Sequence, residues 1–562
     1  MTGTSTTPPP IQGPTAKEKK YDRQLRLWAA AGQQALEEAH VLLLNEGAGT
    51  VGVEMLKNLV LPGIGKFTIV DANVVKEEDL GVNFFLEESS LGKSRAKECC
   101  RLLKELNPDV QGHGIHTAPA DYVKDSSVLQ QYTSILITSP TSLPRTLEVV
   151  ARYAWKHQIS LFFIISNGFY SQFSLQVPAQ FPIVDTHPDP TSTQDLRLLT
   201  PWPELSAFAR VKTAKLETLT DHEHGHIPYL LLLLHYLEEW KNTHDEKAPE
   251  NYREKTSFRE IVSKGIRRDN PEGGEENFDE AVGAVLKSLN LPTISSGLKE
   301  VFEAEQCVNI YAESARFWVI AHAIRDFHET HKVLPLPGAL PDMKSQSADY
   351  IQLQNIYKQK ARKDLAEVAA RVREIEVNNL RETPINEKEI EAFCKGAAFV
   401  KLVKGRRLRI PLSPTMQEDW SGRAEFIIQQ LEDEDSLIPI FIAIYLYQHF
   451  SESHISKDPS SLEKDYEIAM SASMDQFLSS VLTEARNAGN SAEFDIPAAK
   501  ARIEPVIQEL GRSRDGELHN ISALTGGMVA QEVIKVITKQ YIPVDNTCVF
   551  DGISSRAQVF RI

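Results

Sequence analysis

The chain has 562 residues, with 61 Lys and Arg against 77 Asp and Glu, so its formal net charge is −16. At roughly 150 residues per domain, this length predicts about three or four domain-sized units. The composition, 42% hydrophobic and 25% charged, is that of a globular protein. Because phosphate backbones and anionic lipids are bound by clustered Lys and Arg, the acidic balance argues against nucleic acid or a membrane as a partner.

The first 16 residues are rich in Ser, Thr, Pro and Gly and have no apolar core. They predict a disordered tail, residues 1–16, and not a secretory signal. Further along, the apolar run Tyr229–Leu237 is about half as long as a membrane span and predicts a buried helix.

Residues 17–175 alternate between helical and strand patterns. Strands are predicted at Val41–Leu44, at Phe67–Asp71 and over residues 134–138 and 160–165, with amphipathic helical segments between them. Strands that alternate with helices imply a parallel sheet with right-handed crossovers. The segment therefore predicts a Rossmann-like α/β domain.

Helical patterns dominate residues 176–504, and the strand-helix pattern returns at the C-terminal end. There, Gly526 and Gly527 lie within a helical stretch, where small residues allow close backbone approach, and TCVFDG predicts a strand. We therefore expect residues 17–175 and 505–562 to form one α/β domain that is split by a mainly helical insertion over residues 176–504.

A glycine motif, Gly47-x-Gly49-x-x-Gly52, follows the first predicted strand and opens a helix, and Asp71 ends the next strand. In nucleotide-binding domains such glycines let the backbone approach a phosphate at the helix N-terminus, and the acid meets a ribose hydroxyl. The motif is compatible with a working nucleotide site and with inherited architecture that no longer binds.

Two residues before the motif depart from the usual pattern. Asn45 and Glu46 replace the apolar residues expected at the end of the strand. A carboxylate at position 46 would repel a phosphate unless it pointed away, so the departures favour the inherited architecture.

Several longer stretches are similar to the activating enzymes of ubiquitin-like modifiers: YDRQLRLW, GAGTVGVEMLKNLVLPGIGKFTIVD, FFLEESSLGKSRA and GGMVAQEVIKVITKQ. More narrowly, HPDPTSTQDLRLLTPWPEL, LPDM with YIQLQNIYKQKARKD, and the C-terminal block resemble the regulatory subunits of the heterodimeric Nedd-type (neddylation) activating enzymes. The resemblance begins near Lys17 and continues to the C-terminus. It implies a ThiF/MoeB-type adenylation domain whose insertion is half of a catalytic-cysteine domain.

The chain departs from the competent members of that family at two ATP-binding motifs. Their acid-N-x-x-x-R segment, whose Asp holds Mg²⁺, reads Pro140-Thr141-x-x-x-Arg145 here. Their N-L-N-R-Q-F segment reads DLGVNF, with Val82 in place of the Arg. Neither Pro140 nor Val82 can supply a metal ligand or a cationic donor. The domain is therefore predicted to be pseudo-active, with ATP and Mg²⁺ held by a partner subunit and no metal or cofactor in this chain.

On this interpretation Gly47, Gly49, Gly52 and Asp71 form a degenerate, vestigial nucleotide loop. The thioester is also assigned to the partner, because none of the five cysteines lies in the short polar C-T-type segment of the family. These cysteines are Cys99, Cys100, Cys307, Cys394 and Cys548. They include no C-x-x-C pair and are odd in number, which fits a reducing compartment. The alternating His222, His224 and His226 lack zinc-site spacing and predict a hydrophilic loop.

One residue is predicted to act in catalysis. In the family, the Arg of the Y-x-R-Q motif reaches the phosphates in the partner subunit's ATP site, and Arg23 matches it here. The resemblance implies a regulatory subunit that is inactive alone, pairs with a catalytic subunit and completes its ATP site in trans. The assembled enzyme would adenylate a Nedd-type modifier, capture it as a thioester and pass it to a transiently bound conjugating enzyme, in the cytoplasm and nucleus.

Two other function classes stay open on the sequence alone. An NAD-dependent oxidoreductase would use Gly47, Gly49, Gly52 and Asp71, but it leaves YDRQ and GGMVAQE without a purpose. A non-catalytic adaptor would use the helical insertion as an interaction platform, and it differs from the first interpretation in giving Arg23 no role. Within the family, a subunit for a different modifier is disfavoured by the long insertion.

Overall fold

The computed structural model describes residues 15–138, 144–186, 195–269, 274–408, 422–454, 462–488 and 494–562. The chain divides into two compact units, one of Met1–Phe181 with Val403–Ile562 and one of Pro182–Leu402. Most of the predicted tail, up to residue 14, lies outside the described residues. Its last two residues are ordered: Thr15 is the N-cap of helix α1 (Ala16–Lys20) and accepts a hydrogen bond from the Glu18 backbone, and Ala16 is the first residue of that helix.

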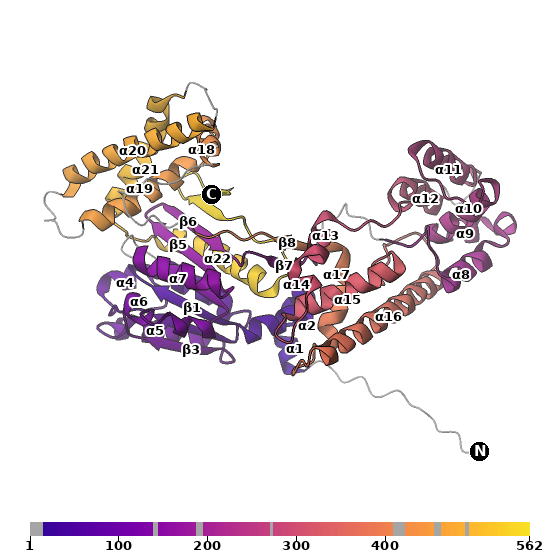
Figure 1. The fold of residues 1–562 in the computed structure, drawn as a ribbon, viewed down its shortest axis with the longest axis horizontal. Helices are drawn as coiled ribbons and strands as arrows, with labels where there is room; N and C mark the ends of the chain where they lie inside the picture. Colours follow the sequence, from indigo (N-terminus) through magenta and orange to yellow (C-terminus); the bar gives the residue numbers. More distant parts are fainter. Residues whose placement is uncertain are drawn as a thin grey trace, which may run out of the picture. The chain divides into compact units, whose positions relative to one another are not determined.

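A mixed eight-stranded sheet, in the order β10-β9-β6-β5-β4-β1-β2-β3, forms the centre of the first unit (Figure 1). Its strands are β1 (His40–Asn45), β2 (Lys66–Val70), β3 (Gln111–Ile115), β4 (Ser134–Thr138), β5 (Ser160–Asn167), β6 (Tyr170–Gln176), β9 (Thr547–Asp551) and β10 (Arg556–Phe560). Strands β1 to β5 are parallel, as predicted. At one edge the parallel sheet is extended by antiparallel pairs, because β6 and β10 run against their neighbours. The link between β5 and β6 is too short for the crossover that parallel strands need.

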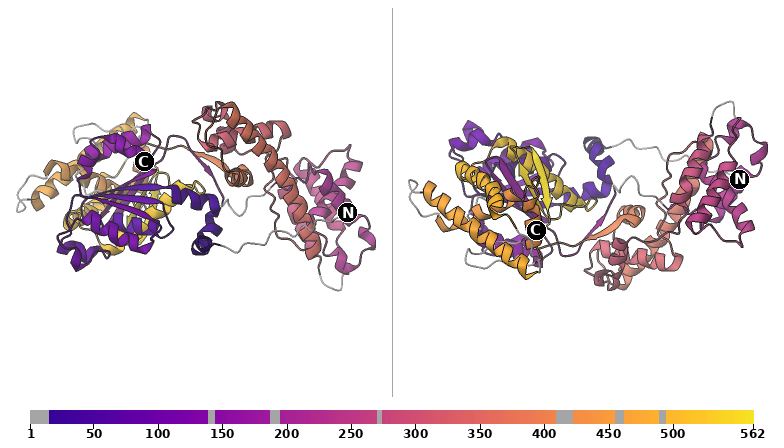
Figure 2. Two further views of the ribbon diagram at one scale, coloured as in Figure 1. Left: turned by 90° about the horizontal axis from the view of Figure 1, so that it is seen from below. Right: turned by 90° about the horizontal axis from the view of Figure 1, so that it is seen from above.

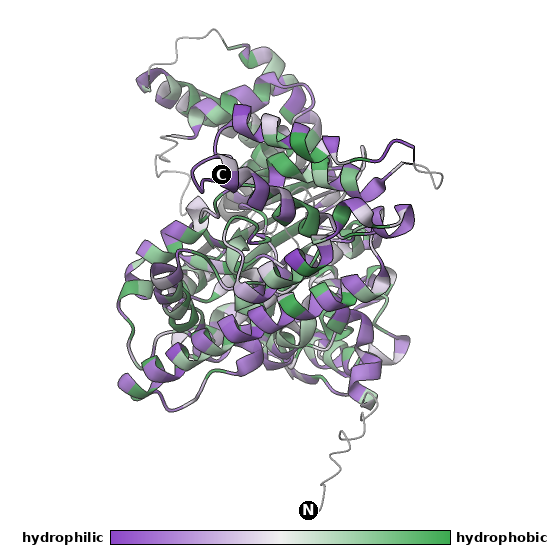
Figure 3. Cartoon of the chain, turned by 90° about the vertical axis from the view of Figure 1, so that its right-hand side faces the viewer, coloured by the Kyte–Doolittle hydropathy of each residue, from purple (hydrophilic) through white to green (hydrophobic). Residues whose placement is uncertain are grey.

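Helices cover both faces of this sheet (Figure 2). The helices of this unit include α2 (Asp22–Glu38), α3 (Thr50–Val60), α4 (Glu77–Val82), α5 (Arg95–Leu106), α6 (Pro119–Tyr122), α7 (Pro144–Lys156), α18 (Ala424–Glu432), α19 (Ile438–His454), α20 (Leu462–Asn487), α21 (Ile496–Ser513) and α22 (His519–Thr538). Successive residues of a strand point to opposite faces. Leu42 and Leu44 of β1 enter one core with α7 and α18 to α21, whereas Leu43 lies against Gly52 of α3. Hydrophobic residues accordingly gather on the strands between the helical layers (Figure 3).

The boundaries of the insertion differ from the prediction. The second unit spans Pro182–Leu402 and not residues 176–504, and the helices α18 to α21 belong to the unit that contains the sheet. Their apolar residues, such as Ile427, Phe441 and Ile503, share a core with the strands β1, β4 and β5. An amphipathic pattern shows that a helix buries one face but not which core receives it, so the sequence placed these helices in the wrong unit.

The second unit is mainly helical. Its elements are β7 (Phe181–Val184), α8 (Pro203–Thr213), α9 (Asp221–His224), α10 (Tyr229–Thr243), α11 (Tyr252–Lys264), α12 (Glu276–Ser288), α13 (Ser296–Glu303), α14 (Glu305–Val308), α15 (Arg316–His331), α16 (Ser347–Asn378), α17 (Glu387–Gly396) and β8 (Val400–Val403). Strand β7 pairs with β8 where the chain enters and leaves this unit. The buried helix predicted from Tyr229 is α10. The loop predicted around the three histidines is instead the short helix α9, in which His224 is buried against Glu275.

None of the helices in the described segments combines the length and the apolar composition that a membrane crossing requires.

Candidate functional site

The glycine loop lies where the strand order of the sheet reverses, at the carboxyl ends of the neighbouring strands β1 and β4. Ligands of open α/β sheets bind at such a switch point. Gly47 and Gly49 both have a positive φ, 63° and 69°, and α3 begins directly after Gly49. The structure thus confirms the strand-loop-helix context that the motif predicted, and it places Asp71, after β2, beside the same loop.

The space that these glycines leave is filled by the Asn45 side chain. A Cβ atom at Gly49 would overlap Asn45 Nδ2, and one at Gly52 would lie 2.8 Å from Asn45 Oδ1. Asn45 is 1% exposed, donates to Asp71 Oδ2 over 3.0 Å and accepts from Thr138 Oγ1 over 2.7 Å. The glycines therefore allow the buried amide of Asn45 to pack closely under the loop. Asn45 is one of the two residues that depart from the apolar pattern expected at the end of the strand.

The acid expected to meet a ribose hydroxyl is sealed inside the protein. Asp71 has no exposed surface, and its Oδ2 also accepts a hydrogen bond from Arg95 Nε at 2.7 Å. The same guanidinium donates to Asp79 Oδ1 at 3.0 Å and to the carbonyl oxygens of Gly47 at 2.6 Å and Ala48 at 3.0 Å. Arg95 is 3% exposed. One buried guanidinium therefore joins the predicted ribose acid to the backbone of the loop.

The N-terminus of α3, where a phosphate would sit, is occupied by a carboxyl group of the chain itself. Glu517 Oε2 accepts a hydrogen bond from the backbone N–H of Val51 at 2.7 Å and another from Ser522 Oγ at 2.6 Å. Burial raises the pKa of Glu517, while the hydrogen bonds from Ser522 and from the α3 backbone act in the opposite direction. The first turn of the helix thus donates to an oxygen that is already part of the fold.

These contacts do not fit a nucleotide in this loop. A phosphate at α3 would have to displace Glu517, and a ribose hydroxyl would have to displace Arg95 or Asn45 from Asp71. Each displacement would leave a buried polar group without its partner, which is costly. The loop is held together by internal hydrogen bonds in place of a ligand.

Arg23 lies away from this loop. It is exposed and belongs to the first turn of α2, two residues after the buried Tyr21. Asn107 Nδ2 donates both to Tyr21 Oη, at 3.0 Å, and to the carbonyl oxygen of Val60, at 2.9 Å. Because Val60 is the last residue of α3, Tyr21 anchors the turn with Arg23 at the end of α3 that is opposite to the glycine loop.

The chain is similar over nearly its whole length to several known proteins. The model of the ThiF family matches residues 21–562. The NEDD8-activating enzyme E1 regulatory subunit of Danio rerio is 36% identical over 98% of this chain and 99% of its own length. The protein of the same name from Xenopus laevis is 34% identical over 97% of this chain and 99% of its own. The NEDD8-activating enzyme E1 regulatory subunit AXR1 of Arabidopsis thaliana is 33% identical over 97% and 96%.

The chain belongs to the ThiF family and, within it, to the NEDD8-activating enzyme E1 regulatory subunits. The fold class and the resemblance predicted from the sequence are thereby confirmed.

One of the two altered ATP motifs, DLGVNF, lies at the end of α4 (Glu77–Val82). Val82 ends α4 as a half-buried apolar residue without a donor group. Within the same motif, Asp79 is buried and engaged by Arg95. Pro140 and the side chain of Arg145 lie outside the described residues.

All five cysteines of this regulatory-subunit family member are buried. Burial raises the pKa of Cys99 and Cys394 to about 12 and that of Cys307 and Cys548 to about 11, and it also raises the pKa of Cys100. A nucleophilic cysteine needs exposure and a lowered pKa. The geometry therefore supports the prediction that none of the five carries a thioester.

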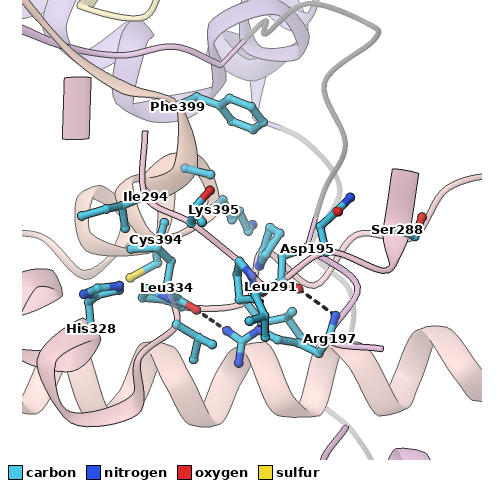
Figure 4. A pocket seen from close by; sticks show the side chains of 18 of the residues that line it. Asp195, Arg197, Ser288, Leu291, Ile294, His328, Leu334, Cys394, Lys395 and Phe399 are labelled. Atoms are coloured by element: carbon cyan, nitrogen blue, oxygen red, sulfur yellow. Dashed lines mark hydrogen bonds and ion pairs between the residues drawn. The ribbon is translucent and has the colours of Figure 1, made fainter. Parts of the chain in front are cut away.

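Of the five, Cys394 has the surroundings most similar to those of a reactive cysteine, because it lines a cavity of about 230 Å³ in the second unit and lies beside His328 (Figure 4). A Cys–His pair is reactive when the thiolate and the imidazolium stabilise each other. Here burial lowers the pKa of His328 and raises that of Cys394, so both are neutral near pH 7. Elsewhere in the cavity, Arg197 is bound to Asp195 and to the Leu334 carbonyl oxygen.

Sequence reasoning found the loop but missed the residues that close it. Glu517 is 466 positions from Val51, and no local pattern links the two. Arg95 lies within the stretch FFLEESSLGKSRA and opens an amphipathic helix, which gives an arginine no sign of burial. The signal that was available was Asn45: a polar residue in an apolar strand must find partners inside the fold.

Proposed function

We propose that this chain is the non-catalytic, regulatory subunit of a heterodimeric enzyme that activates a Nedd-type modifier. The contact that carries the proposal is the 2.7 Å hydrogen bond from the Val51 backbone N–H to Glu517 Oε2. It places a carboxyl oxygen of the chain at the position from which a competent subunit would hold a phosphate. A chain with this arrangement has no use for ATP at its own loop, so the nucleotide and Mg²⁺ belong to the partner subunit.

In the proposed reaction, the C-terminal carboxylate of the modifier attacks the α-phosphorus of ATP, forming an acyl-adenylate and releasing pyrophosphate. A thiolate of the catalytic subunit then attacks the acyl carbon, which forms the thioester and releases AMP. The modifier passes from there to the thiol of a conjugating enzyme. This chain supplies Arg23, a delocalised cation placed against phosphate oxygens of the partner's nucleotide.

The position of Arg23 supports a role in trans. The side chain is exposed, and within the part of the chain that the structure describes it forms no ion pair, whereas Arg26 in the same turn is bound to Asp22 at 3.0 Å. The turn is anchored at the far end of α3 from the chain's own loop. An arginine in this place can serve a nucleotide only if another chain holds it.

The test is an ATP–pyrophosphate exchange assay of the heterodimer. A hydrogen bond to a charged group contributes about 1.5–3 kcal/mol, so Arg23→Ala should slow modifier adenylation about 10- to 100-fold without preventing assembly. Arg26→Ala is the matched control from the same turn and should change the rate by less than about twofold. An unchanged rate for Arg23→Ala would refute the catalytic contribution and favour the pure adaptor.

A second measurement addresses the loop. The isolated chain should show no saturable binding of ATP–Mg²⁺ or NAD⁺ in calorimetric titrations. Binding of NAD⁺ would revive the oxidoreductase interpretation, for which the contacts of Asp71 with Arg95 and Asn45 leave no free ribose acid.

A further inference from the structure

Helix α2 is broken in the middle by an alanine in a backbone conformation that alanine rarely adopts. Ala29 has φ 54° and ψ −177°, and Trp28 before it has φ −122° and ψ 18°. This part of φ/ψ space is essentially restricted to glycine, and other residues remain there only when the surrounding contacts over-determine them. The break separates a helical turn over residues 22–27, which carries Arg23, from the rest of α2.

The C-terminal end of that turn is fixed through Trp28. Its side chain is 6% exposed and folds back over Gly32, where a Cβ atom would lie 2.7 Å from Trp28 Cβ. The indole Nε1 donates to Gln33 Oε1 at 3.3 Å. The carbonyl oxygen of Trp28, which a continuous helix would bond internally, accepts a hydrogen bond from Gln540 Nε2 at 2.8 Å. Gln540 is buried just beyond the end of α22.

The N-terminal end of the turn is fixed through Tyr21. Tyr21 is 3% exposed, and its hydroxyl accepts from Asn107. Its neighbour Lys20 donates to Asn107 Oδ1 at 2.7 Å and to Asp109 Oδ2 at 2.6 Å. Between the two buried aromatic residues, none of residues 22–27 is buried. The fold therefore holds one exposed helical turn rigidly at both ends.

We propose that the strained break at Ala29, clasped by Trp28 and Gln540, is a positioning device that directs Arg23 toward the partner's nucleotide. If α2 continued as a regular helix from Gln33, the first turn would follow a different axis and Tyr21 would leave its pocket. Trp28 and Gln540 are then positioning residues for adenylation. This inference rests on the proposed role of Arg23 in trans and adds which residues set its direction.

The first experiment measures the position of the turn without any enzymatic activity. A nitroxide is attached to Leu27→Cys in the isolated full-length chain, where Leu27 is 45% exposed and the five native cysteines are buried. Gln540→Ala should increase the rotational mobility of the label at least twofold. Gln34→Ala, which removes an exposed glutamine that donates to Glu38 in the second half of the same helix, should leave the mobility unchanged. Equal mobility in Gln540→Ala and in the parent would show that the hydrogen bond from Gln540 to Trp28 does not hold the turn, and would overturn the proposal.

The second experiment measures ATP–pyrophosphate exchange by the heterodimer. Displacing a catalytic group by about 1 Å can cost up to about 100-fold in rate, so Gln540→Ala should slow exchange about tenfold or more. Ala29→Val cannot adopt the native φ and ψ and should slow it as well, whereas Ala29→Gly can and should stay within about twofold of the wild type. Gln34→Ala should have no effect.

A double variant separates positioning from a general loss of structure. In the Arg23→Ala background, Gln540→Ala should reduce the rate by less than about twofold, because the group it positions is absent. A full additional loss in that background, or a wild-type rate for Gln540→Ala alone while Arg23→Ala is slow, would overturn the positioning role. If Arg23→Ala itself is not slow, the proposed function fails with it, and the label mobility still reports separately on the clasp.

Discussion

Arg95 offers the most direct test of the idea that internal hydrogen bonds and ion pairs hold the glycine loop. Its guanidinium is 3% exposed and binds two buried carboxylates, Asp71 and Asp79, together with two carbonyl oxygens of the loop. The variant Arg95→Met keeps most of the side-chain volume but leaves both carboxylates without a counter-charge. In an open nucleotide site, water would solvate such groups. In this closed network it cannot.

The magnitude follows from the burial. Removing one partner of a buried ion pair costs about 3–5 kcal/mol, and because neighbouring interactions do not add, we take about 4 kcal/mol for Arg95→Met. A urea m-value near 3 kcal/mol/M, at the upper end for small proteins because m rises with size, converts this to a midpoint lower by about 1.3 M. The midpoint is measured by hydrogen exchange at the amides of β1 and β2. These strands lie in the first unit, so unfolding of the second unit does not affect the measured midpoint.

The matched control is Arg101→Met on the same helix. The Arg101 side chain is 46% exposed and pairs with Glu98 and Glu105 on the surface. Such pairs contribute about 0–1 kcal/mol, so its midpoint should move by less than about 0.3 M. Adding Asp71→Asn and Asp79→Asn to Arg95→Met removes the orphaned charges and should recover at least half of the loss. If the midpoints of Arg95→Met and Arg101→Met coincide, the buried network does not hold the loop.

Three further predictions concern other parts of the first unit and the cysteines. At Gly526 an added Cβ would lie 2.8 Å from the Met55 backbone nitrogen, whereas at Gly527 nothing lies within 4 Å. Urea midpoints should therefore show Gly526→Ala losing up to about 3 kcal/mol and Gly527→Ala gaining about 0.5–1 kcal/mol, and a reversed order would contradict the packing. Because burial raises the pKa of Glu517 above the ordinary 4.5, the folded state binds the proton more tightly and loses stability as the pH rises from 4.5 toward the folded pKa. The melting temperature of Glu517→Gln minus that of the wild type should thus increase as the pH rises over that range. A difference that does not change with pH would contradict the prediction. Finally, the native chain should react negligibly with an aromatic disulfide reagent at pH 8 until it is unfolded, and rapid labelling of any native thiol would contradict the burial of all five.

The local structure of the α/β unit could be predicted from the sequence because its signals are local. The apolar run Val41–Leu44 and the segment Phe67–Asp71 alternate with helical periodicity, and the glycines between them lie where a strand must turn into a helix. In this region the predicted and observed elements agree to within one or two residues.

The remaining features depend on contacts between distant residues, and periodicity does not encode such contacts. The Glu517 carboxyl group closes a loop in a different part of the sequence, and the helices α18 to α21 join a core to which no local pattern assigns them. The break at Ala29 also has no local signal, because alanine favours an unbroken helix and Gln540, which bonds the Trp28 carbonyl oxygen, is 512 positions from Trp28.

The central sheet has a consequence for how this chain is made. Strand β6 lies between β5 and β9, and Ser174 of β6 bonds Thr547 of β9 across 373 positions of sequence. At a synthesis rate of about 5–20 residues per second, β6 emerges from the ribosome about 20–75 seconds before its neighbour exists. During that interval its unpaired edge is a template for wrong pairing with other chains. Until β9 arrives, the edge of β6 is therefore open to such mispairing.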